Sequence, residues 1–496
     1  MLNVSKKRGY ILSLSSILLL IFLLRFTSID FPVLDWDESV YFVVTQDMTH
    51  GGVPYKTAWA HKGPMLFFIL FPVVSLAPKS IPALRIFTTL YLLCSMLVLY
   101  LLSKRLFPER IPLLAPLVYG LFFTSSRFGG MASNAELFMM LPVLMAFLFL
   151  WRYLEEHNRL WSHLPTVGML AATSILIKPN ALFSLFIIPL CLIFREKGII
   201  GNWRRLLIEC FVIALGAVPP LLAVLWFFAG HKALSDLYYS VWVFNVAYVR
   251  HTPPLEAFRL LAIFLNERLR GLNVDWISAL GFGSFLFILL RRNFTPKERY
   301  LVVVVTALAL FSLVGVYCGR KMYPHYYLQM GFPFSLVIPL ALSLTQIPKR
   351  HCNAVVLATL LCAIGVMPIR TVWDFMGKEP SEANKTQHEI ANYVASNSSS
   401  NDSLFVLGAQ PIIYFLSDRY APTKYFFWLH HCGYWQEILN MEKEAIAAFT
   451  DHMPHFIVFK EHDLGRVDYI ENIIEEKYCL DKTFDDISVY KLKVLD

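Results

Sequence analysis

The sequence DWDESVYFVVTQDMTHGGVPYKTAWAHKGP, residues 35–64, lies between two apolar runs and decides how the rest of the chain is organised. It places three carboxylates, Asp35, Asp37 and Glu38, shortly after the first apolar segment, and Lys62 directly before the next one. Charged side chains at a membrane boundary are costly and are usually retained for function. We therefore expect this stretch to form the first loop outside the membrane and to carry chemistry.

The composition is that of an integral membrane protein. The 496 residues are 56% hydrophobic and only 16% charged, whereas soluble domains have about 25% charged residues. Repeated runs of about 20 apolar residues predict membrane-spanning helices, so lipids are expected partners. The net charge of +8 resides mostly in short loops, where Lys and Arg set the topology. No nucleic-acid partner is expected.

We expect an α-helical polytopic membrane protein with about eleven spans. Lys6, Lys7 and Arg8 precede the first apolar segment, which predicts a cytoplasmic N-terminus. No small-residue cleavage site follows that segment, so it is expected to remain as a span. The predicted spans are residues 9–27, 84–103, 112–126, 135–152, 163–177, 181–194, 206–229, 276–290, 300–317, 327–345 and 353–369.

The apolar run Met65–Ala77 is too short for a normal span and predicts an interfacial or re-entrant helix. If it crossed the membrane, every later basic loop would lie outside, against the positive-inside rule. Residues 28–83 are therefore expected to form one outer loop. The predicted location is the inner, or plasma, membrane.

Residues 370–496 are polar and are expected to form a small extracytoplasmic α/β domain, separate from the membrane domain of residues 1–369. The predicted strands are 403–408, 455–460 and 486–492, and the predicted helices are 381–395, 433–448 and 466–478. Cys432 and Cys479 fall in this region. They either form a disulfide or remain two free thiols, and the spacing leaves both possibilities open.

The acidic cluster has a structural interpretation and a functional one. Asp35 and Glu38 have the spacing of a helix start, with Asp35 as N-cap and Glu38 reaching back. A helix from Trp36 to about Thr49, ended by Gly51 and Gly52, would place Asp37 and Tyr41 on one face. This interpretation leaves Asp37 without a structural partner, which makes it a candidate general base.

Cations gather on the same predicted side of the membrane, although the topological rule disfavours them there. Singly, each is explained by contact with lipid headgroups; together they predict a cavity that binds a phosphate. The cations are Lys62, Arg85, Arg127, Lys178, Arg250, Arg320 and Lys321.

Two further residues accompany these cations. Glu136 opens a predicted span, where the helix dipole alone would favour an acid. His325 follows Arg320 and Lys321 among several tyrosines, in an aromatic belt or in a site that contacts phosphate or sugar. The chain contains no Walker, dinucleotide-binding, HExxH or GxSxG motif, so any donor is expected to arrive within the membrane.

At these positions the chain resembles the bacterial branch of the protein O-mannosyltransferase and aminoarabinose transferase group, which has the GT-C fold. The resemblance rests on Asp37-Glu38-x-x-Tyr41, Gly51-Gly52-x-Pro54-Tyr55 and Lys62-Gly63-Pro64. It continues in Arg85, in Asn134-x-Glu136 and in Tyr323-Pro324-His325-Tyr326, and the C-terminal domain also fits. The motifs therefore extend over nearly the whole chain, and those of the first loop are the most specific.

The resemblance implies a glycosyltransferase that moves a sugar from a polyprenyl phosphate to an acceptor hydroxyl on a glycan, lipid or protein, with inversion. Asp37, Glu38 and Glu136 would be catalytic, with Asp37 as base, and Asp35, Tyr41 and Tyr326 would contact the sugar or acceptor. The donor phosphate would be bound by Lys62, Arg85, Lys178, Arg320, Lys321 and His325.

A divalent metal is possible, because Asp35, Asp37 and Glu38 offer hard oxygen ligands, but the many cations do not require one. The alternative function is a transporter or flippase of lipid-linked glycans. A transporter would be expected to show repeat symmetry and charges near the middle of the membrane. The charges here lie towards one face, which favours the enzyme. A catalytically dead scaffold is the third hypothesis.

Overall fold

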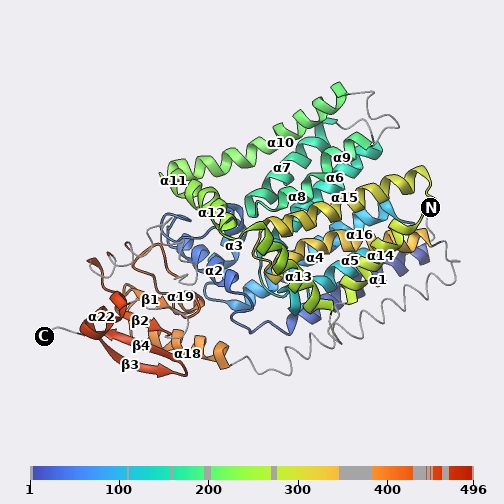
Figure 1. The fold of residues 1–496 in the computed structure, drawn as a ribbon. Coiled ribbons are helices and arrows are strands. Elements are labelled where there is room, and N and C mark those ends of the chain that lie inside the picture. Colours follow the sequence, from blue (N-terminus) through green and yellow to red (C-terminus); the bar gives the residue numbers. More distant parts are fainter. Residues whose placement is uncertain are drawn as a thin grey trace. The chain divides into compact units, whose positions relative to one another are not determined.

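In its described residues the protein is mostly helical, with a small sheet near the C-terminus (Figure 1). A computed structural model describes residues 4–108, 111–156, 160–194, 203–269, 276–345, 382–427, 443, 447, 451–460 and 468–493. The fold is that of a multi-pass membrane protein followed by an α/β region, as the sequence predicts.

Six of the described helices are long and apolar enough to cross a membrane. The segments that meet these criteria are Arg8–Phe26 in α1 (Val4–Phe26), α4 (Ile81–Leu106), α6 (Ala135–Glu156), α10 (Trp203–Gly230), α15 (Pro296–Cys318) and Pro324–Leu344, which joins η5 (Pro324–Met330) to α16 (Gly331–Leu344).

The other predicted spans before residue 346 are present as shorter apolar segments. They are η1 with α5 (Ile111–Leu113 and Leu114–Phe122), α7 (Leu160–Ile177), α8 with α9 (Ala181–Leu185 and Ile187–Phe194) and α14 (Trp276–Leu290). The last predicted span, 353–369, lies outside the described residues. The count of eleven spans therefore remains a prediction.

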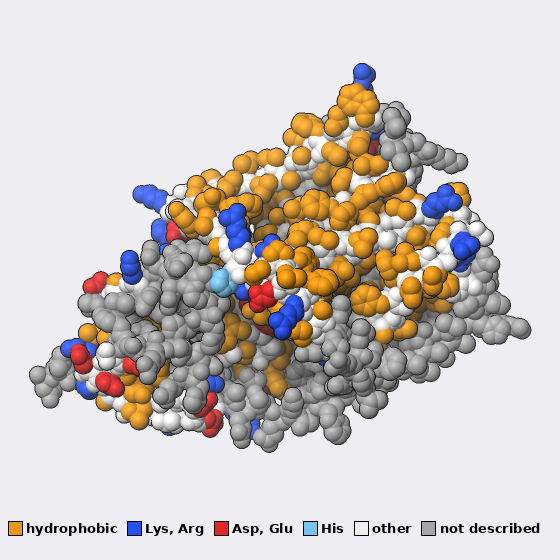
Figure 2. Space-filling model, in the orientation of Figure 1, with side chains coloured by type: hydrophobic (Ala, Val, Ile, Leu, Met, Phe, Trp, Pro, Cys, Tyr) orange, Lys and Arg blue, Asp and Glu red, His pale blue; other side chains and the backbone are white. Residues whose placement is uncertain are grey.

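The spanning helices present apolar side chains on their outer surface. Figure 2 shows hydrophobic side chains covering the face over α10, α7 and α15. Leu207, Phe211 and Leu222 of α10 are each more than half exposed. A large contiguous apolar surface is expected to face lipid rather than water.

The loop after α1 contains two helices that pack against each other. α2 (Trp36–Thr49) has the predicted bounds, and α3 (Pro64–Leu76) lies where the short apolar run predicts a helix. The 13 residues of α3 would be only about 20 Å long, against about 30 Å of hydrocarbon in a bilayer. α3 is therefore too short to span the membrane upright.

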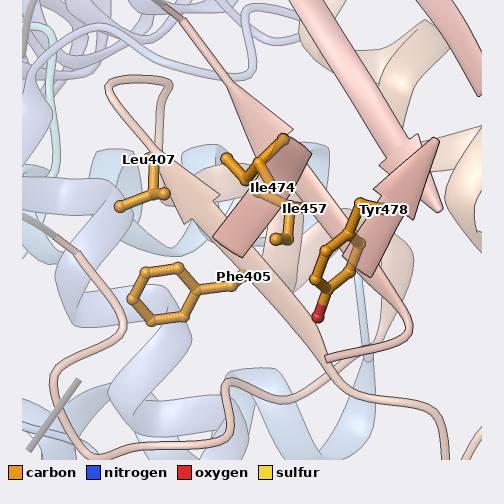
Figure 3. Packing of buried hydrophobic residues seen from close by; sticks show 5 residues of the cluster. All are labelled: Phe405, Leu407, Ile457, Ile474 and Tyr478. Atoms are coloured by element: carbon orange, nitrogen blue, oxygen red, sulfur yellow. The ribbon is translucent and has the colours of Figure 1, made fainter. Parts of the chain in front are cut away.

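The C-terminal sheet has four strands in the order β1-β2-β4-β3. β1 (Leu404–Leu407) pairs in parallel with β2 (Phe456–Phe459), and β4 (Ile487–Leu492) pairs antiparallel with β2 and with β3 (Tyr478–Phe484). Figure 3 shows the apolar cluster that packs on this sheet: Phe405, Leu407, Ile457, Ile474 and Tyr478.

Most elements of the C-terminal region match the sequence prediction. α18 (Glu382–Ser396), α22 (Asp468–Lys477), β1, β2 and β4 are confirmed, whereas β3 and α19 (Ile412–Ser417) were not predicted. The helix expected over 433–448 lies largely outside the described residues, as does Cys432. Cys479 is an exposed, free thiol in β3.

The chain divides into two compact units. The first contains residues 1–29, 85–225 and 252–377, and the second contains residues 30–84, 226–251 and 378–496. Residues 30–84 thus belong to the same unit as the C-terminal region, and the candidate residues are distributed over both units. The sequence-based boundary at residue 370 remains a prediction.

Candidate functional site

The start of α2 is fixed by two of the three carboxylates. The side chain of Asp35 caps the helix by accepting a hydrogen bond from the backbone N–H of Asp37, at 3.0 Å. Glu38 accepts from the backbone N–H of Leu34 at 2.7 Å, one residue before the cap. These contacts satisfy N–H groups that have no partner inside the helix. The capping interpretation of Asp35 and Glu38 is thus supported by the structure.

The third carboxylate, Asp37, forms an ion pair with Lys62. Its Oδ2 lies 2.9 Å from the Lys62 Nζ, and the Lys62 side chain is only 7% exposed. The Tyr41 hydroxyl, one helical turn later, donates to the same Oδ2 at 3.1 Å. Asp37 was expected to have no structural partner. That expectation is wrong, because the loop returns Lys62 to the start of the helix that carries Asp37.

The position of Lys62 is set by a buried tyrosine. Tyr55 has a positive φ of 70°, which is rare for a residue with a large side chain. Its hydroxyl donates to the backbone carbonyl of Lys62 at 2.6 Å, and its ring stacks on Phe228. Burial raises the pKa of Tyr55 well above its usual value. The hydroxyl therefore remains a neutral donor that holds Lys62 in place.

His61, next to Lys62, extends this arrangement. Its Nε2 lies 3.4 Å from the Lys62 Nζ, and its Nδ1 lies 3.1 Å from the Oδ1 of Asn245. The ring also contacts Phe244 and Tyr248 of α12 (Phe244–His251). Asp37, Lys62, His61 and Asn245 thus form one continuous chain of polar contacts within the second unit.

The first unit contains a second buried ion pair. Lys178 donates to the Oε1 of Glu136, at the start of α6, and both side chains are almost fully buried. The Lys178 ammonium also lies 4.5 Å from the centre of the Tyr326 ring, a cation–π contact. Glu136 Oε2 is buried and has no hydrogen-bond partner among the described residues. The sequence prediction named all three residues but not this pairing.

The remaining predicted ligands have structural contacts of their own. Arg320, at a positive φ of 55°, donates to the backbone carbonyl of Thr252 at 3.0 Å. His325 stacks on Tyr323 and meets Tyr326 edge-on, so it lies in an aromatic cluster. Lys321 follows Arg320 in the loop after α15, and Arg85 is buried in α4. Their role as phosphate ligands stays a prediction.

The structure also reveals polar residues that the sequence did not single out. Arg25, near the end of α1, is buried and donates to the carbonyls of Phe123, Gly130 and Met131. A cation in the last turn of an apolar helix was the available signal. His61 could have been predicted from its position next to Lys62 in the sequence. No sequence pattern pointed to Asn245.

The acidic cluster at the start of α2 was also a candidate metal site. Among the described residues, no group of three or more His, Cys, Asp or Glu side chains is placed to hold a metal ion. Asp35 and Glu38 are used in capping α2, and Asp37 is paired with Lys62. In the described structure the three carboxylates thus contact α2 and Lys62 rather than converge on one point.

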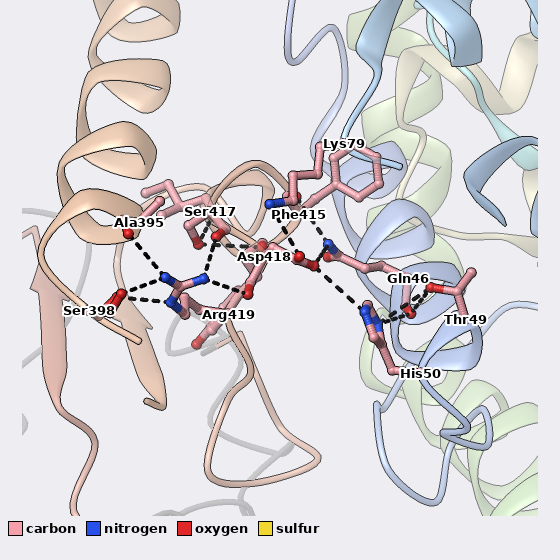
Figure 4. A network of polar contacts seen from close by, with 12 residues as sticks. Gln46, Thr49, His50, Lys79, Ala395, Ser398, Phe415, Ser417, Asp418 and Arg419 are labelled. Carbon is pink, nitrogen blue, oxygen red and sulfur yellow. Dashed lines mark hydrogen bonds and ion pairs between the residues drawn. The ribbon is translucent and has the colours of Figure 1, made fainter. Parts of the chain in front are cut away.

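The far end of α2 is linked to the C-terminal region through Asp418. Its carboxylate accepts from the Gln46 amide at 2.8 Å and pairs with Lys79 at 3.2 Å, and His50 lies 3.9 Å away (Figure 4). Asp418 has a positive φ of 57° at the end of α19. The neighbouring Arg419 donates to the carbonyl of Ala395 in the last turn of α18 and to that of Ser398 just after the helix. α2, α18 and α19 are thus linked by polar contacts.

We expect Asp418→Gly to loosen this link while retaining the left-handed backbone, which glycine adopts without strain. Losing hydrogen bonds to a charged group typically costs about 1.5–3 kcal/mol. Hydrogen–deuterium exchange should then rise at the C-terminal end of α2 and in α18. Asp418→Asn, which keeps an acceptor, is the control and should exchange less. Equal exchange in wild type and Asp418→Gly would contradict the proposed link.

Comparison with known proteins agrees with this fold. The family model described as dolichyl-phosphate-mannose-protein mannosyltransferase matches residues 61–226, which include Lys62, Glu136 and Lys178. No curated protein sequence matches the chain.

Solved structures match over nearly the whole chain. ArnT from Cupriavidus metallidurans, bound to undecaprenyl phosphate, superposes with a TM-score of 0.67 at 12% identity, covering 97% of this chain and 98% of ArnT. Its apo form gives 0.66 at 12% identity, covering 98% of both chains. Archaeoglobus fulgidus AglB, with an inhibitory peptide and dolichol phosphate, gives 0.54 at 13%, covering 92% and 70%. The predicted GT-C fold is confirmed.

Proposed function

We propose that this protein is a membrane glycosyltransferase that transfers a sugar from a polyprenyl phosphate to an acceptor hydroxyl. The observation that carries the proposal is the Asp37–Lys62 pair, a carboxylate and an ammonium held 2.9 Å apart at the start of α2. The family match over residues 61–226 and the ArnT-like fold support the reaction class. The proposed location is the inner membrane, with a cytoplasmic N-terminus and the C-terminal region outside.

In the proposed reaction, Asp37 takes the proton of the acceptor hydroxyl. The acceptor oxygen attacks the anomeric carbon, and the bond from that carbon to the phosphate oxygen breaks. The bonding electron pair leaves with the polyprenyl phosphate, and the sugar is joined to the acceptor with inversion. General base catalysis of this kind contributes about 10²–10⁴-fold.

Lys62 has two functions in this proposal. Its ammonium pairs with Asp37 and fixes the position of this carboxylate before the acceptor arrives. An ammonium has three N–H donors, so Lys62 can bind a phosphate oxygen while it remains paired with Asp37. Charge that develops on the departing phosphate is stabilised electrostatically by such a fixed donor.

The other predicted site residues are proposed to have the following roles. Lys178 and Arg85, both buried cations of the first unit, are proposed donor-phosphate ligands together with Arg320, Lys321 and His325. Glu136 is proposed to be catalytic, acting through its Oε2, which is buried and has no hydrogen-bond partner among the described residues. Tyr41 and Asp35 are proposed to act on the site through Asp37, and Tyr326 through Lys178.

The lipid donor is proposed by analogy with the similar structures. ArnT was solved with undecaprenyl phosphate, and AglB with dolichol phosphate and a peptide. The acceptor of this protein is proposed to be a glycan, lipid or protein with a free hydroxyl. The anionic phosphate is the feature that the proposed cationic ligands would recognise.

The function is tested with purified protein in proteoliposomes that contain radiolabelled undecaprenyl-phosphate sugars. Wild type should release undecaprenyl phosphate and move the label to a membrane-extract acceptor. If no sugar is transferred but the labelled lipid reaches the opposite leaflet, the transporter hypothesis is correct instead. A panel of hexose and pentose donors then identifies the sugar.

We expect Lys62→Met to raise the KM for the lipid donor by about 10–100-fold, because hydrogen bonds to charged groups contribute about 1.5–3 kcal/mol. Methionine keeps much of the side-chain length, so α2 and α3 should remain packed. The measurement is KM for the donor at saturating acceptor. A variant that no longer inserts into the membrane would instead show that Lys62 has only a structural role.

A further inference from the structure

His61 lies between a charged residue and a neutral amide, and both of its ring nitrogens have a partner. Nε2 is 3.4 Å from the Lys62 Nζ, and Nδ1 is 3.1 Å from the Asn245 Oδ1. These two contacts constrain which ring nitrogen of His61 carries the proton.

The orientation of the Asn245 amide is fixed by its own hydrogen bonds. Its Nδ2 donates to the His61 carbonyl at 2.8 Å and to the Val241 carbonyl at 2.9 Å. Both acceptors are carbonyl oxygens, so the nitrogen must lie on that side and Oδ1 must face the imidazole. Since Oδ1 only accepts hydrogen bonds, the His61 Nδ1 must carry a proton.

The same reasoning applies to the other ring nitrogen. A charged Lys62 ammonium only donates hydrogen bonds, so the neighbouring Nε2 of His61 must present a lone pair. The neutral tautomer with the proton on Nδ1 satisfies both partners. A doubly protonated imidazole would place an N–H against the ammonium, and the two positive charges would repel each other.

Local backbone geometry places Asn245 for this contact. Residues Tyr239–Val243 form a π-helical turn between α11 (Leu234–Tyr238) and α12. Single π turns occur frequently at functional sites, because one added residue rotates the side chains that follow. Here the residues that follow are Phe244 and Asn245, and both contact His61.

The ring is also enclosed on its apolar side. Trp59 stacks on His61 with ring centres 6.1 Å apart, and Phe244 meets the ring edge-on at 5.2 Å. Trp59 itself packs against Tyr425 and Phe427 from the C-terminal region of the same unit. These aromatic contacts restrict the rotation of the imidazole, so Nε2 is held towards Lys62.

We propose that His61 is a positioning residue, which holds the Lys62 ammonium through the lone pair of Nε2 in a tautomer that Asn245 enforces. The inference rests on the proposed function, in which Lys62 binds the donor phosphate. With Asp37 on one side and His61 on the other, the ammonium is held from two directions. These two contacts fix where the ammonium lies, which is what a phosphate ligand requires.

The test uses two isosteric replacements of His61. The amide of glutamine lies near the Nε2 position and offers Lys62 an oxygen acceptor, whereas the shorter amide of asparagine lies near Nδ1. We expect His61→Gln to retain kcat/KM for the lipid donor within about 3-fold. His61→Asn should lose about 10-fold or more, as expected for a lost charged hydrogen bond. The KM for the acceptor should not change in either variant.

A double-mutant cycle with Lys62→Met shows whether His61 acts through Lys62. If it does, His61→Asn has no further effect once Lys62 is methionine, because the effects of coupled residues are not additive. Full additivity overturns the inference, as do equal losses in the glutamine and asparagine variants, or no loss in either. If wild type itself transfers no sugar, the proposed function fails instead.

A second variant keeps the test decisive if His61→Asn does not fold. Asn245→Ala removes the acceptor that enforces the tautomer without touching Lys62. We expect kcat/KM for the lipid donor to fall by about 3–10-fold, since a neutral hydrogen bond contributes about half as much as a charged one. The loss should again be absent in the Lys62→Met background. A loss that persists there would assign Asn245 a purely structural role and overturn the inference.

Discussion

Replacing Asp37 by asparagine is expected to lower kcat by about 10²–10⁴-fold, the usual contribution of a general base. The amide has nearly the shape of the carboxylate, and its oxygen still accepts hydrogen bonds from Lys62 and Tyr41. It cannot take a proton from the acceptor hydroxyl. The loss should therefore appear in kcat, with KM for the lipid donor changed much less than in Lys62→Met.

The matched control is Asp47→Asn, the same change on the same helix. Burial raises the pKa of Asp47, while the Thr57 hydrogen bond and the nearby His50 oppose that shift. An amide at this position still accepts from the Thr57 hydroxyl. We expect Asp47→Asn to retain wild-type kcat. Similar losses in both variants, or a fully active Asp37→Asn, would refute the assignment of Asp37 as the base.

The start of α2 could be predicted from the sequence because its signals are local. Asp35 and Glu38 act on backbone N–H groups within a few residues, and Gly51 lies just beyond the C-terminal end of the helix. Capping depends only on short sequence spacing. The Tyr41–Asp37 contact follows from one helical turn, so it too could be expected.

The ion pair of Asp37 could not be predicted in the same way. It depends on the path of residues 51–63, where Tyr55 takes a positive φ and anchors the Lys62 carbonyl. No pattern of hydrophobicity predicts that a tyrosine will adopt a left-handed backbone conformation. The sequence indicated that Asp37 and Lys62 share one loop, but the contact between them comes from tertiary packing.

The errors in the C-terminal region have a similar cause. β3 begins at the residue directly after α22 and is largely exposed along its length, with buried residues only at its two ends. A strand of this kind shows no alternation of polar and apolar residues, which is the usual signal. β1 and β2 are short but strongly apolar, so they were predicted.

The membrane helices also carry charged residues whose partners the sequence did not indicate. Apolar length predicted the helices well, but α6 carries a charged residue at each end that apolar length does not explain. Glu136 at its start is buried against Lys178, and Glu155 near its end pairs with Arg105 at the surface. Both glutamates lie on α6, and one pair is buried while the other is exposed, so the two pairs allow the effect of burial on an ion pair to be measured.

Breaking the Glu136–Lys178 pair is expected to destabilise the protein by about 3–5 kcal/mol, because the remaining charge is buried without a partner. Glu136→Leu and Lys178→Met should therefore each lower the apparent melting temperature strongly. The double variant should recover most of the loss, since an apolar pair of similar volume often replaces a buried ion pair without penalty. Thermal unfolding of detergent-purified protein provides the measurement.

The matched control is the Arg105–Glu155 pair, whose side chains are 28% and 39% exposed. Exposed pairs contribute about 0–1 kcal/mol, so Glu155→Leu should change the melting temperature little. If it destabilises the protein as much as Glu136→Leu does, burial is not what makes the Glu136–Lys178 pair important. Comparable melting temperatures for Glu136→Leu and wild type would refute the prediction directly.

The double variant also separates stability from chemistry at Glu136. If the pair only holds α6 near α8, a stable Glu136→Leu/Lys178→Met protein should transfer sugar at nearly the wild-type rate. If Glu136 acts on substrate through its buried Oε2, and Lys178 on the phosphate, the recovered protein remains inactive. We expect the second outcome, because a pair kept only for stability is readily replaced by apolar side chains.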